Sequence, residues 1–116
     1  IDSNYLFALT SRAFAFNTQR NYKSAIRDFS KAITLSPKDP RLYNGRAHAL
    51  TSTKQLKLAI ADYNKIIELN PSDSWAYFYR GVLRRNESDK LGACLDLKKA
   101  YGLGIERAQR FLKKCD

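Results

Sequence analysis

The 116-residue chain contains no methionine, one tryptophan, one histidine and only two cysteines. Cys94 and Cys115 form no C-x-x-C pair, and with His48 alone to join them they lack the ligand spacing of a zinc site. The five glycines form no phosphate-binding loop. Every apolar run is too short to cross a bilayer. The sequence therefore predicts no metal ligands, no cofactor and no membrane span.

Acidic residues are also scarce, because 11 acidic side chains stand against 21 basic ones and leave a formal net charge of +10. Net charge alone bears on solubility and on steering of partners, not on fold. Two interpretations stay open: a solvated basic surface, or a surface that meets an acidic partner.

The residues that are present recur at a fixed interval. The stretch from Ala59 to Pro71, AIADYNKIIELNP, matches the stretch from Ala25 to Pro37, AIRDFSKAITLSP, 34 residues earlier. A weaker copy runs from Ala93 to Ile105, ACLDLKKAYGLGI. A period of this size is typical of repeat architectures, in which neighbouring units bury a continuous core.

These recurring residues resemble the tetratricopeptide repeat (TPR) family. The small residues of the pattern are Ala13, Ala47 and Gly81, then Ala25, Ala59 and Ala93; the large ones are Leu9, Tyr43 and Tyr77, then Phe29, Tyr63 and Leu97. Two residues of the third copy depart from it, Arg84 and Ile105. The resemblance implies an all-α fold over residues 1–116: a right-handed α-solenoid of three helix–turn–helix units at 6–39, 40–73 and 74–107, with a capping helix at about 105–115.

Start and stop signals predict helices at about 5–17, 22–35, 40–52, 56–69, 74–86 and 90–101. Pro37 ends one helix, and Asp39 and Asp73 are expected to cap the next ones. Ser3 or Asn4, and Asn21, are the expected N-caps of the first two. One Arg and one Asp recur in every copy, and we expect them to pair as Arg12–Asp28, Arg46–Asp62 and Arg80–Asp96.

The chain carries no pattern typical of catalysis, so we expect it not to be an enzyme. His48 has no neighbouring nucleophile motif, and the recurring aspartates occupy structural positions of the repeat. For Cys94 and Cys115 two outcomes stay open, buried free thiols or a disulfide between the last two helices.

The family resemblance also implies that the first helix of each unit lines a concave groove. The side chains it places there are Phe7, Thr10, Phe14, Asn17, Arg41, Asn44, His48, Thr51, Trp75, Phe78, Val82 and Arg85. Aromatic side chains beside arginine and asparagine are typical of a peptide-binding surface. The sequence thus predicts a non-enzymatic protein–protein interaction scaffold that binds a peptide or helix, acidic or apolar, of another protein.

Two alternatives are an RNA-binding helical-repeat module, which the basic charge favours, and self-association as part of a longer repeat array. Nucleic acid is the less favoured partner, because the basic residues are scattered over outer faces. The chain begins at Ile1 almost directly in a repeat, which favours a fragment of a longer protein. The compartment stays open, with the cytoplasm favoured.

One subclass of TPR partners is expected to be excluded. Domains that hold the EEVD tail of a chaperone use Lys, Asn and Arg side chains at five positions, where this sequence has Thr10, Phe14, Gly45, Trp75 and Tyr79. The resemblance therefore implies that an EEVD tail is not the partner.

Overall fold

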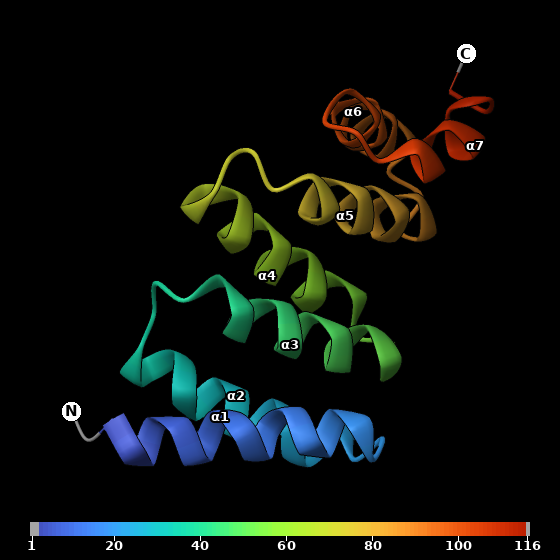
Figure 1. The fold of residues 1–116 in the computed structure, drawn as a ribbon. Helices are drawn as coiled ribbons and strands as arrows, with labels where there is room; N and C mark the ends of the chain where they lie inside the picture. Colours follow the sequence, from blue (N-terminus) through green and yellow to red (C-terminus); the bar gives the residue numbers. More distant parts are fainter. Residues whose placement is uncertain (1–2, 116) are drawn as a thin grey trace. The chain divides into compact units, whose positions relative to one another are not determined.

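The computed structural model describes residues 3–115, and within them every regular element is a helix. The chain divides within α4 (Leu56–Leu69) into two compact units, residues 1–62 and 63–116, and each is described by itself (Figure 1). The predicted all-α class is confirmed.

The first unit contains α1 (Ser3–Thr18), α2 (Tyr22–Leu35), α3 (Pro40–Ser52) and the start of α4. Helix α2 packs against both α1 and α3. The core of the first unit is formed by Leu9, Ala13, Ala25, Phe29, Ala32, Leu42 and Ala49. Ala13 and Ala25 are fully buried, as expected where small side chains let two helices approach closely.

The second unit contains the end of α4, α5 (Ser74–Asn86), α6 (Lys90–Gly102), the short 3-10 helix η1 (Glu106–Ala108) and α7 (Gln109–Leu112). Its core is formed by Phe78, Leu97, Ala100, Ile105 and Ala108. Two of these five side chains, Ile105 and Ala108, come from residues 103–115, which we call the C-terminal segment. This segment therefore completes the core of this unit.

The predicted helix bounds hold for α2, α3, α4 and α5, and α6 is longer by its last residue. The predicted N-cap at Ser3 or Asn4 is wrong, because both residues belong to α1. The capping helix expected at about 105–115 is shorter, since η1 and α7 together end at Leu112. Beyond it the chain turns toward α6, where Cys115 is bonded to Cys94.

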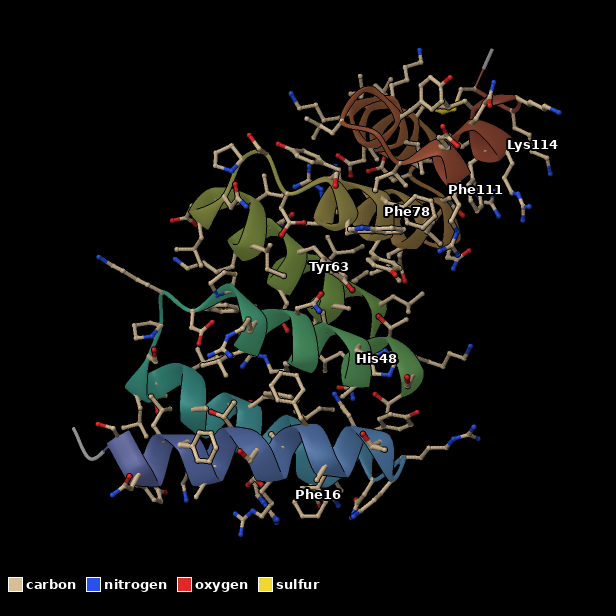
Figure 2. The ribbon with its side chains drawn as sticks, in the orientation of Figure 1. Phe16, His48, Tyr63, Phe78, Phe111 and Lys114 are labelled. Atoms are coloured by element: carbon tan, nitrogen blue, oxygen red, sulfur yellow. A yellow bond between two sulfur atoms is a disulfide. The ribbon has the colours of Figure 1, made fainter. Side chains whose placement is uncertain are left out.

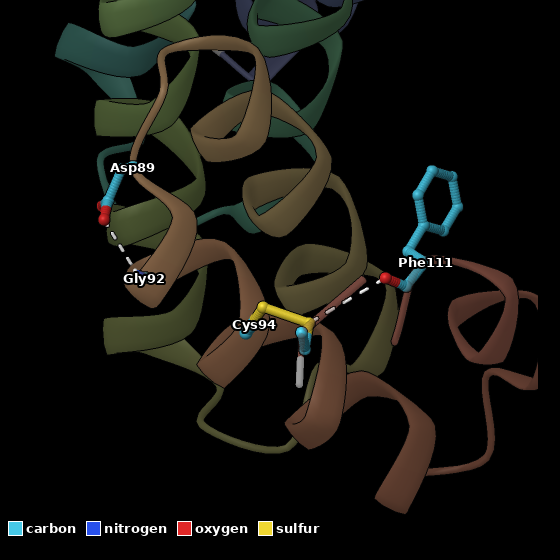
Figure 3. Close-up of a disulfide and its surroundings, with 5 residues drawn as sticks. Asp89, Gly92, Cys94 and Phe111 are labelled. Atoms are coloured by element: carbon cyan, nitrogen blue, oxygen red, sulfur yellow. Dashed lines mark hydrogen bonds between the residues drawn. A yellow bond between two sulfur atoms is a disulfide. The ribbon is translucent and has the colours of Figure 1, made fainter. Parts of the chain in front are cut away.

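Aspartate caps fix three helix starts. Asp39 accepts a hydrogen bond from the amide of Arg41, and Asp73 accepts one from the amide of Ala76, as predicted. Asp89 caps α6 by accepting a hydrogen bond from the amide of Gly92, a cap that was not predicted (Figure 3). Asn21 stands at the N-cap position of α2, but its side chain makes no capping hydrogen bond.

The turn inside each helix pair reverses the chain through one left-handed residue. These residues are Arg20, Lys54 and Ser88, with φ of 62°, 64° and 66°. In each case the next amide donates to the carbonyl five residues earlier, for example Asn21 N to Phe16 O at 2.8 Å. This bond closes the preceding helix by the Schellman geometry, here without the glycine that is its usual signal.

The predicted Arg–Asp pairs are present in all three helix pairs. Each arginine donates two hydrogen bonds to its aspartate, and the shorter bond measures 2.7 Å in Arg12–Asp28, Arg46–Asp62 and Arg80–Asp96. Arg46 also donates to Ser30, and Arg80 to Asn64.

Arg84, which departs from the apolar residue expected in the third repeat, donates to Asp96 at 2.9 Å. The departure therefore adds a second cation to one buried carboxylate.

Between residues 3 and 115, no helix is both long and apolar enough to cross a membrane.

Candidate functional site

In the first unit, several side chains expected to bind a peptide are exposed. Phe7 is 73% exposed, and Phe14 stands edge-on against the buried Phe29, with ring centroids 4.8 Å apart. Asn44 and His48 on α3 are exposed, and the ring of His48 lies 6.0 Å from that of Tyr22 (Figure 2). The exposed side chains of this unit therefore include apolar, amide and imidazole groups.

Other predicted residues of this unit bond within the fold. The side-chain amide of Asn17 donates to the carbonyl of Gly45 at 3.0 Å, which ties α1 to α3. The hydroxyl of Thr51 donates to the carbonyl of Ala47 at 2.8 Å, and Thr10 is half-buried. Arg41 is exposed and forms an ion pair with Asp39 at 2.8 Å.

In the second unit, Trp75 and Tyr79 form a stacked pair, which we call the Trp75–Tyr79 platform. Their ring centroids lie 5.7 Å apart at an interplanar angle of 27°. Tyr79 stacks in turn on the buried Tyr63, at 5.8 Å and 26°. Tyr79 is therefore the middle ring of three, and the two rings of the platform stay accessible, because Trp75 is 42% and Tyr79 39% exposed.

A cation from the C-terminal segment lies over this platform. The guanidinium carbon of Arg107, in η1, lies 5.7 Å from the ring centroid of Trp75 and 5.5 Å from that of Phe78. Such contacts between a cation and a ring face are favourable and orient both groups. Trp75 thus contacts Tyr79, Arg107 and the edge of Phe78, whose ring centroid lies 5.6 Å away, and it is still 42% exposed.

Phe78 does not belong to an accessible surface, contrary to its place in the predicted groove. It is only 3% exposed, and its ring stands edge-on to that of Phe111 on α7, 5.8 Å away (Figure 2). The reason is that Ile105, Ala108 and α7 cover this side of α5. Val82 is half-buried against the same core.

Arg85 is exposed, but its guanidinium carbon lies 4.6 Å from the ring centroid of Phe111. It therefore lies against the C-terminal segment. Tyr79 and Arg107, which both contact Trp75, were not among the side chains predicted to line the groove. For Tyr79 a signal existed, because it follows Trp75 by four residues on a helix and so shares its face.

The pKa values of two ion-paired carboxyl groups shift in opposite directions, because the ion pair dominates at one and burial at the other. The side-chain hydrogen bond from Arg41 lowers the pKa of Asp39 below its usual range. Burial raises the pKa of Asp62, and the hydrogen bonds from Arg46 oppose that shift.

Within residues 3–115, no three His, Cys, Asp or Glu side chains gather as metal ligands would.

Helix pairs that recur with the same left-handed turn and the same Arg–Asp pair place the chain in the class of α-helical repeat proteins. Tetratricopeptide repeat models match residues 8–39, 40–73 and 62–96, and the chain belongs to the TPR family. Domains of this kind are protein–protein interaction modules. No curated protein sequence matches the chain.

Solved TPR structures are similar to the chain over nearly its whole length. The first TPR domain of Spaghetti (RPAP3), bound to the HSP90 peptide SRMEEVD, is 27% identical, with a TM-score of 0.88 over 99% of this chain and 93% of that one. The first TPR domain of human RPAP3 is 27% identical, with a TM-score of 0.83 over 95% and 88%. The TPR2B domain of yeast Sti1, in a complex with pHsp70, is 23% identical, with a TM-score of 0.84 over 95% and 94%. These similarities confirm the predicted TPR solenoid fold.

The first of these structures also contradicts in part the expectation that an EEVD tail is excluded. That expectation compared five side chains with one binding pattern. A domain 27% identical to this chain holds a peptide that ends in EEVD. The types of five side chains are therefore not sufficient to exclude an EEVD tail as a ligand of this chain. An acidic peptide remains a valid probe for this chain.

Proposed function

We propose that this TPR domain is a non-enzymatic scaffold that binds a peptide segment or helix of a partner protein, and that the Trp75–Tyr79 platform anchors one apolar or aromatic side chain of it. The observation that carries the proposal is the exposed, stacked pair of rings, with Arg107 over Trp75. Large rigid rings bury much area at little entropic cost, which is why such residues dominate binding interfaces.

The charge of the chain favours a partner segment that carries carboxylates around its apolar anchor. The formal net charge is +10, and Arg107 contributes a cation beside the platform. Complementary charge accelerates association and fixes orientation more than it raises affinity. Phe7, Phe14, Asn44 and His48 of the first unit form a second set of exposed contacts for the same class of ligand.

The test is calorimetric titration with a panel of peptides. It includes SRMEEVD, the same peptide with an amidated C-terminus, and a neutral apolar peptide. Trp75→Ala is expected to weaken the tightest of these complexes by about 2 kcal/mol, roughly 30-fold in Kd. The matched control is Tyr101→Ala, a ring of comparable exposure on α6 outside the platform.

An unchanged Kd for Trp75→Ala, with an unchanged melting curve, would refute the platform as the anchor. Equal weakening by Tyr101→Ala would point to nonspecific contact. For the intact domain, the single tryptophan of the sequence provides a second readout. Its fluorescence should shift when the anchor covers the indole.

RNA is the second candidate, because exposed stacked rings beside an arginine can also stack on bases. Single-stranded RNA should bind only weakly at physiological salt, since few cations surround the platform. Sub-micromolar affinity with a steep salt dependence would favour RNA over a peptide.

A further inference from the structure

The second unit contains a pocket that the platform does not use. It has a volume of about 330 Å³ and lies where the ends of α5, α6 and the C-terminal segment meet. It is lined by Arg85, Lys90, Ala93, Cys94, Leu97, Phe111, Lys114 and Cys115. Figure 3 shows the disulfide of this pocket beside α6 and Phe111.

The interior of the pocket is apolar and tied to the core. Ala93 and Leu97 are buried, and Phe111 packs edge-on against Phe78. The disulfide holds the Cα atoms of Cys94 and Cys115 5.7 Å apart and so joins two sides of the pocket covalently. A ligand with an apolar body would meet a surface that is already formed.

Three of the lining residues are cations, and no lining residue is acidic. Within the part of the chain that the structure describes, no carboxylate forms an ion pair with Arg85, Lys90 or Lys114. Asp89, which precedes Lys90 in the sequence, accepts from the amide of Gly92, and its carboxylate lies 3.9 Å from Arg84. Among the described residues, the lining of the pocket therefore combines three cations with no carboxylate.

Arg85 is positioned to bind an anion. Its guanidinium lies against the ring of Phe111, with the guanidinium carbon 4.6 Å from the ring centroid. A guanidinium in contact with an aromatic ring keeps N–H groups along its edge, and those groups match the two oxygens of a carboxylate. The ring also limits the motion of the side chain, so less rotamer freedom is lost on binding.

We propose that this pocket binds a carboxylate carried on an apolar body. The apolar body lies against Phe111 and the disulfide, since Ala93 and Leu97 expose only 1% of their surface each. Arg85 binds the carboxylate, with Lys90 and Lys114 beside it. Both halves of the ligand follow from the lining, because neither a bare anion nor a neutral apolar molecule satisfies the cations and the apolar walls together. The site is separate from the Trp75–Tyr79 platform and does not rest on the peptide proposal.

The test is calorimetric titration of the intact, oxidised domain with octanoate at low salt. We expect saturable binding with one site. Arg85→Gln should weaken it about tenfold or more, because a hydrogen bond to a charged group is lost. The matched control is Lys113→Gln, which removes the same charge from an exposed neighbour that does not line the pocket. Its Kd should stay within about twofold.

Three results would overturn the proposal: no binding heat up to about 10 mM octanoate, equal binding of 1-octanol, or equal weakening by Lys113→Gln. A short acetylated peptide with a free carboxylate on an apolar last residue identifies the source of the ligand. Tighter binding of that peptide assigns the site to a chain terminus, and tighter binding of octanoate assigns it to a free amphipathic acid. Trp75→Ala should leave octanoate binding unchanged, so failure of this proposal is distinguishable from failure of the peptide site.

Discussion

At the scale of single residues, the three Arg–Asp pairs share one geometry but not one environment. The three aspartates are buried in all cases. The side chain of Arg12 is 59% exposed, whereas that of Arg80 is only 15% exposed. An arginine near solvent can be rehydrated when its partner is removed, and a buried one cannot.

Asp96→Ala should therefore destabilise the fold far more than Asp28→Ala does. Loss of Asp96 leaves both Arg80 and Arg84 without their buried carboxylate, and we expect a cost of about 3 kcal/mol. For Asp28→Ala we expect a clearly smaller loss. Urea unfolding of the two variants measures the difference, and equal losses would contradict the argument.

Low pH should destabilise the fold partly by protonating Asp39. Because Arg41 lowers the pKa of Asp39 in the folded state, this carboxylate contributes stability above its unfolded pKa of about 3.9. That contribution is lost as the pH falls through the lower, folded pKa. Asp39→Asn should retain the helix cap but show a shallower decrease in stability between about pH 4 and 2. If the stability of the variant falls with pH as steeply as that of the parent protein, Asp39 does not contribute to the acid dependence.

The residue-scale site could be predicted only in part from the sequence. Repetition of Arg and Asp at fixed positions was sufficient to predict the three pairs. Trp75 and Phe78 have the spacing of neighbours on one helix face, yet only Phe78 is buried. What separates them is the cover of Ile105 and Phe111, which no local pattern in α5 could indicate.

At the scale of helices, the bounds were predictable wherever proline and aspartate mark them. Pro37 marks the end of α2, and Asp39 and Asp73 mark the starts of α3 and α5. These signals can be read from the sequence because the backbone preferences behind them are local. The turns at Arg20, Lys54 and Ser88 are different, since no glycine marks their left-handed residues. The helix closures there depend on backbone hydrogen bonds, which form here with Arg, Lys and Ser in the left-handed position.

Gly45→Ala tests how closely α2 and α3 approach. A Cβ atom at residue 45 would lie within van der Waals overlap of the ring of Phe29, with several ring carbons closer than 3.0 Å. We expect destabilisation of about 1–3 kcal/mol from overpacking. The control is Gly102→Ala, where nothing lies within 4 Å of the new atom. Its melting temperature should stay level or rise, and an equal loss in both variants would exclude the steric explanation.

At the scale of the whole chain, the disulfide is the one covalent link between distant residues of the described sequence. Cys94 and Cys115 are separated by 21 residues, and the segment between them includes η1 and α7. Closing a loop of this size restricts the unfolded chain and stabilises the fold by about 3 kcal/mol. The sequence left this bond open because spacing alone does not set the distance between two thiols.

The variant with Cys94→Ser and Cys115→Ser should therefore melt several degrees lower than the oxidised protein. A reductant should lower the melting temperature of the parent protein by a similar amount and leave the variant unchanged. If the double variant has the same melting temperature as the oxidised protein, the disulfide contributes nothing to stability. Thermal unfolding followed by circular dichroism separates these outcomes.

The same bond turns residues 94–115 into a covalent ring. A protease that cuts once inside the ring, for example after the exposed Arg107, opens the backbone without releasing either fragment. The nicked molecule would migrate as one band on a non-reducing gel and as two bands after reduction. Limited digestion could thus sever the connection between α6 and α7 while the severed end stays attached to the helix it covers.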